Sequence, residues 1–295
     1  MKHNIISFFG IMAMAVGLNS CSEDVNVPDI ENADGRLSME FSFSHPSESR
    51  ATETAFESGD AVGLFVAEAD RPLEIAGNTV NNAKLTFDGS AWKSKRTLYW
   101  DNGQYNAYAY YPYLDNITSI SDQPFEVKTD QRDGSQAMSG YEASDFLFAS
   151  AKNISASANP ISLQFRHIMS KITIRLIKGE DFEGEIPETA TVYIHNTVTQ
   201  SNIDLTAGVA TKALRGASKT ITARQAGPTS YSAIIVPQRL ENRVPLIEVE
   251  MNGVSFLYVS KFLFNPGIHH IVNLVVDKNP DQVKIEVGGE ITNWN

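Results

Sequence analysis

Apolar and polar residues alternate along many short segments of this chain. Period-two alternation places one set of side chains in a core and the other in water, which is typical of β-strands. Gly, Pro, Asn and Asp separate these segments, and no long stretch has the period of an amphipathic helix. The best helical candidate is the short segment 139–144. The clearest alternating segments are 37–44, 161–166, 171–176, 247–251 and 283–287. The pattern predicts an all-β protein made of β-sandwiches rather than of α/β units.

The alternation is interrupted at two places, which suggests how the chain is divided. Residues 21–36 are polar and precede the first alternating segment, so we expect a tether there. Between 178 and 187 the pattern breaks and Gly, Glu and Asp concentrate, which is typical of a linker. The sequence therefore predicts an N-terminal β-sandwich domain over 37–178 and a smaller C-terminal one over 188–295.

The first residues follow a different pattern. Lys2 and His3 form a basic start, and a short apolar run over 5–18 follows. This run is too short for a membrane span, which needs about 20 apolar residues, and fits the apolar region of a secretory signal. It ends in Leu18-Asn19-Ser20-Cys21, which resembles the lipobox of bacterial lipoproteins. We therefore expect residues 1–20 to be a signal peptide and Cys21 to carry a diacylglyceryl lipid at the mature N-terminus.

An acidic pair follows this cysteine directly. Ser22-Glu23-Asp24 resembles the surface-export signal of Bacteroidetes lipoproteins, although tethers are often acidic and both interpretations stay open. Cys21 is the only cysteine, so no disulfide forms within the chain.

Composition and motifs exclude several classes of function. The formal net charge is -11, which argues against a nucleic-acid partner because phosphate binding needs clustered Lys and Arg. Nucleophile elbows, zinc spacings and phosphate loops are not found, and Asp130 to Gly134 lacks the spacing of a calcium loop. His167 lies inside a strand pattern without a second ligand nearby, so we interpret it as an interior histidine. We expect no enzyme activity, no metal site and no cofactor.

Six short motifs occur in order along the chain. They are FESGDAVGLF at 56–65, LYW at 98–100 followed by YNAYAYYPY at 105–113, DFLFA at 145–149, FRHIMSKI at 165–172, IVPQ at 235–238 and ITNW at 291–294. Together these motifs resemble the fimbrillin family of Bacteroidales, the subunits of type V pili. The resemblance implies two tandem transthyretin-like, Greek-key β-sandwich domains. It also implies a structural or tip subunit of a cell-surface fimbria that supports adhesion and reaches the outer membrane as a lipoprotein.

In that family a protease cuts after an arginine near the N-terminus, and the first strand leaves. A strand from the next subunit then fills the groove. By this resemblance the displaced strand contains Leu37, Met39, Phe41 and Phe43. The predicted cut lies between Arg50 and Ala51, within a polar stretch that we expect to be exposed. The alternative is that Arg50 is an ordinary loop arginine and the strand stays in place. Arg36 is a weaker candidate, because a cut there leaves the strand attached.

Stalk subunits of the family carry a donor strand near their C-terminus. The candidate here contains Val283, Ile285 and Val287. If this segment is not donated, the subunit accepts a strand without giving one, which is expected of a tip subunit or of a single lipoprotein. The expected partners are other fimbrial subunits, an Arg-specific protease, the outer membrane through the lipid, and a ligand on a host or bacterial surface.

One alternative function remains open at this point. The chain could be a non-polymerising surface lipoprotein that binds a glycan or a peptide, with Trp92, Trp100 and the tyrosines as a platform for sugar rings. Exposed aromatic side chains would support this hypothesis, and buried ones would remove the platform.

Overall fold

The computed structural model describes residues 35–46, 55–133, 138–278, 284–285 and 290–294. Within these ranges the chain consists of β-strands, loops and one turn of 3-10 helix, η1 (Glu142–Ser144), which lies in the predicted helical segment. The all-β class is therefore confirmed. In this described part, no helix has the length and apolarity to cross a membrane.

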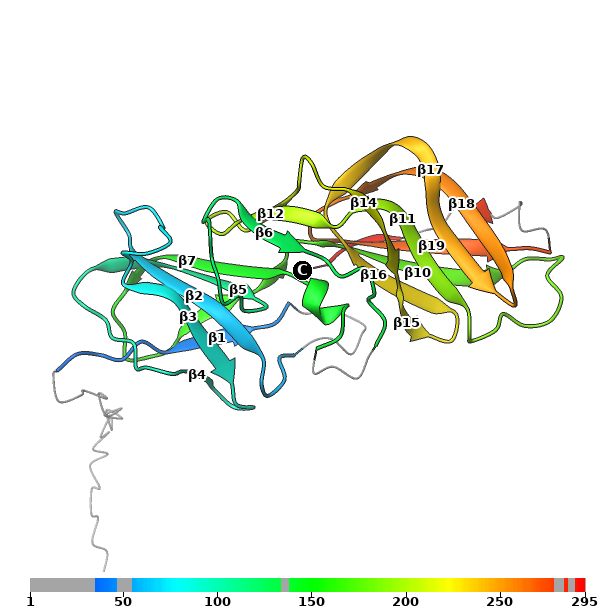
Figure 1. The fold of residues 1–295 in the computed structure, drawn as a ribbon. Helices are drawn as coiled ribbons and strands as arrows, with labels where there is room; N and C mark the ends of the chain where they lie inside the picture. Colours follow the sequence, from blue (N-terminus) through cyan, green and yellow to red (C-terminus); the bar gives the residue numbers. More distant parts are fainter. Residues whose placement is uncertain (1–34, 47–54, 134–137, 279–283, 286–289, 295) are drawn as a thin grey trace, which may run out of the picture.

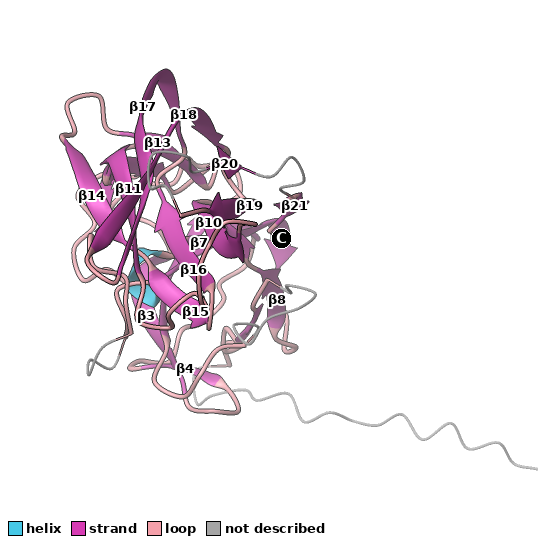
Figure 2. Cartoon of the chain, turned by 90° about the vertical axis from the view of Figure 1, so that its right-hand side faces the viewer, coloured by secondary structure: helices cyan, strands magenta, loops and turns pink. Residues whose placement is uncertain are grey.

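The strands form five sheets (Figures 1 and 2). The N-terminal sheet has the order β4 (Trp92–Ser94), β3 (Val80–Phe87), β2 (Ala61–Glu68), β5 (Gln104–Tyr111), β7 (Leu147–Ser155) and β9 (Arg166–His167). Beside it lies a parallel pair, β1 (Phe41–Ser44) and β8 (Ile161–Gln164). A small sheet joins β13 (Val209–Lys212), β12 (Gln200–Asp204) and β6 (Gln123–Glu126).

Two further sheets build the C-terminal part of the molecule. The β10 sheet has the order β15 (Arg224–Gly227), β16 (Ser230–Ile235), β10 (Ser170–Lys178) and β19 (Ile268–Val276), and both β20 (Lys284–Ile285) and β21 (Ile291–Asn293) pair with β19. The β17 sheet has the order β14 (Ser218–Thr222), β11 (Thr191–Val198), β17 (Gln238–Met251) and β18 (Val254–Phe264). Asn252 and Gly253 connect β17 to β18 with φ angles of 51° and 74°, the conformation that a tight two-residue hairpin requires.

The N-terminal sheet is buried on both faces, which explains the aromatic motif in β5. Tyr105 and Tyr111 belong to a smaller core between this sheet and the β1–β8 pair, whereas Tyr108 and Tyr110 face a larger core. Trp100 is buried in the smaller core, and Trp92 is half-buried against it. The side chains proposed as a sugar platform are thus mainly core residues, and they do not form an exposed surface on which sugar rings could stack.

The larger core is continuous from the N-terminal sheet into both C-terminal sheets. Strand β10 pairs with β16 and β19, and β6 pairs with β12, so strands that precede residue 178 complete sheets of the C-terminal part. The division into 37–178 and 188–295 stays a proposal, and the pairing of β10 argues for an earlier boundary, before Ser170.

Candidate strand-exchange site

The backbone of the predicted first strand is bound on both sides. Phe41 to Ser44 pair in parallel with Ile161 to Gln164 of β8. On the other side, the Met39 amide donates to the Leu98 carbonyl at 2.8 Å, and the Trp100 amide donates to the Leu37 carbonyl at 2.9 Å. The regular strand is shorter than the predicted 37–43, because only isolated bridges, at Leu37 and Ser38, precede Phe41.

The alternate side chains of this segment enter the smaller core. Met39, Phe41 and Phe43 are 7%, 5% and 8% exposed, and the half-buried Leu37 packs against the same core. The Phe43 and Trp92 rings are nearly perpendicular, with a centroid distance of 5.0 Å. This burial confirms the face that the alternation assigns to the core.

Strand β1 covers one face of the N-terminal sheet. On β2, the side chains of Val62, Leu64 and Val66 lie in the smaller core with no exposure, and residues of β5 and β7 extend this face. Because β1 supplies several of the large side chains opposite that face, its removal would expose a continuous apolar groove. The geometry therefore makes β1 the segment that completes the smaller core.

The chain leaves β1 and returns close to the same place. The rings of His45 and Phe56 lie 5.0 Å apart, edge to face, although Arg50 and Ala51 stand between them in the sequence. Arg50 and Ala51, like Cys21, lie outside the described residues, so cleavage and lipidation stay predictions.

The C-terminal segment is bound to the edge of its own β10 sheet. Ile285 pairs with Leu274 of β19, and β21 pairs with Ile268 to His270, whereas Val283 and Val287 lie outside the described residues. The buried Trp294 ring stacks on His167 at a centroid distance of 3.7 Å with an interplanar angle of 5°.

His167 lies at the centre of this C-terminal contact. It is 3% exposed, and its Nδ1 lies 2.9 Å from Asp145 Oδ1. Sequence reasoning identified His167 as an interior residue but not its stacking on Trp294, for which the terminal ITNW motif was the available signal.

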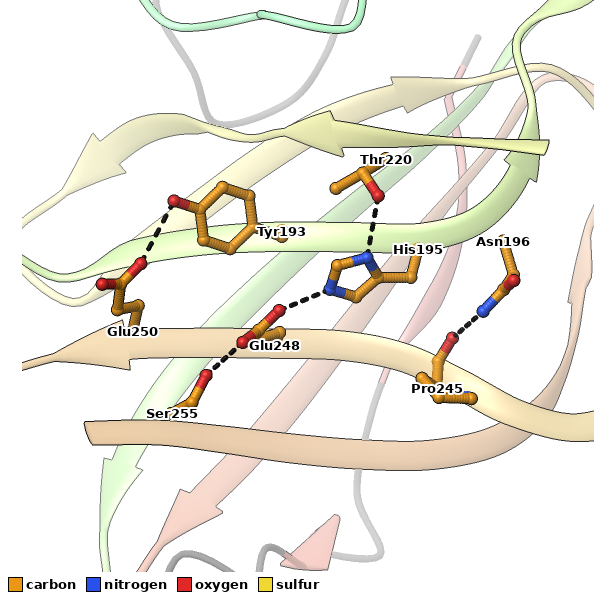
Figure 3. Close-up of polar contacts among 8 residues, drawn as sticks. All are labelled: Tyr193, His195, Asn196, Thr220, Pro245, Glu248, Glu250 and Ser255. Carbon is orange, nitrogen blue, oxygen red and sulfur yellow. Dashed lines mark hydrogen bonds and ion pairs between the residues drawn. The ribbon is translucent and has the colours of Figure 1, made fainter. Parts of the chain in front are cut away.

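A separate polar cluster lies on the β17 sheet (Figure 3). His195 Nε2 is 2.7 Å from Glu248 Oε2, and His195 Nδ1 is 2.9 Å from Thr220 Oγ1. Ser255 Oγ donates to the other Glu248 oxygen, and this hydroxyl, followed by His195, holds the pKa of Glu248 below its ordinary value. Because both nitrogens of His195 and both oxygens of Glu248 are engaged, the cluster ties β14, β11, β17 and β18 together.

A shallow depression of about 410 Å³ borders this cluster, with Asn196, Lys219 and Leu257 among its lining residues. Asn196 has a φ of 59° at a bulge in β11, and its amide donates to the Pro245 carbonyl at 2.8 Å. No group of His, Cys, Asp and Glu suited to hold a metal is found among the described residues.

These sheets define a β-sandwich protein whose smaller core is completed by its N-terminal strand. Residues 49–294 match the sequence model of a family described as fimbrillin-like, and the chain belongs to this family.

Two curated relatives carry names connected with fimbriae. A protein of Bacteroides ovatus named as a fimbrium tip subunit is 29% identical over 163 residues, which are 49% of this chain and 29% of the relative. A protein of Bacteroides uniformis named as a fimbrium subunit is 24% identical over 210 residues, which are 65% of this chain and 64% of the relative. This chain therefore spans less than two thirds of the length of either relative.

A solved structure supports the fold. The crystal structure of a protein of Bacteroides uniformis described as a cell adhesion protein superposes with a TM-score of 0.67. The comparison covers 90% of this chain and 100% of the other, at 18% identity. At that identity, the likeness concerns the fold alone.

Proposed function

We propose that this chain is a structural or tip subunit of a cell-surface fimbria that is assembled by protease-triggered strand exchange. The observation that carries the proposal is the position of β1. Its alternate side chains complete the smaller core, and the segment that links it to the rest of the fold contains Arg50. Membership of the fimbrillin-like family and the names of the relatives support the same function.

Cleavage after Arg50 would leave β1 attached only by non-covalent contacts. These are the four-residue parallel ladder with β8, the backbone bonds to residues 98–100, and the buried side chains. Burial of a large apolar side chain is worth about 1.5–3 kcal/mol, so most of the free energy that holds β1 resides in Met39, Phe41 and Phe43. A strand with the same alternation can replace these contacts, because ladder hydrogen bonds are independent of sequence.

The proposed route also gives the lipid a defined role. A diacylglyceryl group on Cys21 would hold the precursor at the outer membrane. Since Cys21 precedes β1 in the sequence, cleavage after Arg50 would release the lipid together with that strand. The mature subunit would then remain at the surface through its contacts with other subunits.

The role of the C-terminal segment is a further part of the proposal. Donation of 283–287 would require residues 284–285 to leave β19, where their backbone pairs in this structure. If the segment stays on β19 and no other strand is donated, the subunit would accept a strand without giving one, as expected of a tip subunit or of a single lipoprotein.

The test is treatment of the full-length chain with an arginine-specific protease, followed by mass spectrometry of the N-terminus and electron microscopy of the products. We expect a folded product that begins at Ala51 and assembles with fimbrial subunits. The variant Arg50→Lys keeps the charge and should remain uncut and unassembled. Arg36→Lys is the matched control and should behave like the unmodified chain. Assembly of the uncut Arg50→Lys variant would refute the mechanism.

The alternative of a non-polymerising surface lipoprotein makes a different prediction in the same experiment. It requires that the chain neither loses its first strand nor assembles, with or without Arg50. The burial of Trp100 and of the β5 tyrosines leaves that alternative without its aromatic platform.

A further inference from the structure

Strand β18 forms one edge of the β17 sheet. It pairs with β17 along one side, and no backbone partner is found on its other side among the described residues. Figure 1 shows β18 at the outer side of β17. The strand is long, with 11 residues, so its free edge presents a long row of backbone donors and acceptors.

This edge has little of the protection that edge strands usually carry. Charged residues, prolines and short length normally prevent an edge from pairing with another chain. Lys261 is the only charged residue in β18, and the strand contains no proline. Leu257 and Leu263 are 43% and 41% exposed on its outer face.

The sequence of β18 is symmetric about Ser260. It reads FLYVSKFLF from Phe256 to Phe264, so that three of the four residues on one side have a similar type at the same distance on the other, and only Val259 and Lys261 differ. In an antiparallel pair of two such strands centred on Ser260, Leu257 of each copy would lie opposite Leu263 of the other. Phe256 would lie opposite Phe264, and Tyr258 opposite Phe262.

We propose that β18 is a self-complementary docking edge, at which two copies of this chain pair antiparallel about a two-fold axis through Ser260. Pairing would join the two four-stranded β17 sheets into one continuous sheet. It would also bring the exposed leucines of the two outer faces into contact. Lys261 lies opposite Val259 of the other copy in this register, so the arrangement places no like charges directly across from each other.

This contact is independent of the proposed strand exchange. The exchange involves β1 and the smaller core, whereas β18 belongs to the β17 sheet and borders the larger core. The full-length Arg50→Lys variant, which cannot begin the proposed exchange, therefore serves as the parent chain. Sedimentation velocity over a range of concentrations then measures self-association in the absence of strand exchange, and variants of β18 identify the part that depends on this strand.

Two double variants of the parent test the register. Leu257→Lys with Leu263→Lys places like charges opposite each other at two symmetric positions, and we expect dimerisation to weaken by about tenfold or more. Leu257→Lys with Leu263→Glu places opposite charges at the same positions and should retain the dimer. Within one chain these two positions face Glu248 and Arg239, so the charge-swapped variant is also locally compatible.

The controls separate pairing from folding. Leu214 is 99% exposed and lies outside the β17 sheet, so Leu214→Lys should leave the dimer unchanged. Circular dichroism verifies that each variant is folded. Dimerisation of the parent, which carries no leucine substitution, tests the proposal independently of the variants. A parent that remains monomeric would overturn the proposal. Equal dimerisation of both double variants, or equal loss in both, would overturn the register about Ser260.

Discussion

Gly63 of β2 is a position at which a single added methyl group should have a large effect. Gly63 lies opposite Tyr110 of β5, and a Cβ atom at Gly63 would stand 2.2 Å from Tyr110 Cζ. The Tyr110 ring has little room to move, because its hydroxyl donates to Asn82 Oδ1 at 2.5 Å. The ring also stacks on Phe146, with a distance of 5.6 Å between the ring centroids. Overpacking of this kind typically costs about 1–3 kcal/mol, so we expect Gly63→Ala to lower the free energy of unfolding by that amount.

Urea unfolding followed by tryptophan fluorescence measures this change. Gly227→Ala is the matched control, because a Cβ there would meet only Ser230 Cβ at 3.6 Å, an ordinary contact. The cause is tested in a Tyr110→Ala background, where the ring is absent and the added methyl group should cost much less. A cost below about 0.5 kcal/mol, or an equal cost in both backgrounds, would refute the reasoning.

Two further predictions concern the polar cluster and the C-terminal contact. The folded-state pKa of Glu248 lies below its ordinary value of 4.5, so its contribution to stability is complete above that pH and is lost as the pH falls through the folded pKa. Glu248→Gln should therefore reduce the loss of stability on acidification, measured as the difference between the urea midpoints at about pH 6 and about pH 3. Glu185→Gln is the control and should not change this difference, because the Glu185 side chain is 94% exposed. Trp294→Ala should lower the free energy of unfolding by about 3–5 kcal/mol, because the ring is 2% exposed and stacks on His167; a loss below about 1 kcal/mol in urea unfolding would contradict this role.

The alternation of apolar and polar residues predicted which face of a strand is buried better than it predicted which strands pair. The segments 161–166, 171–176 and 247–251 lie in or overlap β8, β10 and β17, and most of the expected side chains are buried. The exception is β10, where Lys171 and Thr173, expected on the solvent face, are buried as well. Strand β1, however, pairs in parallel with a segment about 120 residues away, and β10 joins strands of the C-terminal part. A period of two specifies which side chains are buried, but it carries no information about which distant strand supplies the neighbouring backbone.

The polar cluster was missed for a related reason. His195, Glu248 and Thr220 come from three strands, and none of them belongs to a local motif. The sequence contains only a weak signal for this cluster. The alternation over 247–251 assigned Glu248 to the solvent face, but nothing in the sequence indicated that a histidine would lie beside it. Contacts of this kind depend on register, and register is fixed only when the sheet is assembled.

The size of the β1 side chains limits which strand can replace it in the proposed exchange. Phe41 and Phe43 fill the smaller core against Trp100, Trp92 and Phe165. A replacement strand must keep the same alternation, because a slip of one residue would turn its apolar side chains away from the core. The candidate donor of this chain offers Val283, Ile285 and Val287, which are smaller than phenylalanine.

Unfilled volume in a core costs about 24 cal/mol per Å³. A second copy of this chain would therefore fill the groove less completely than a strand with aromatic residues at the corresponding positions. This difference favours a donor from another fimbrial subunit.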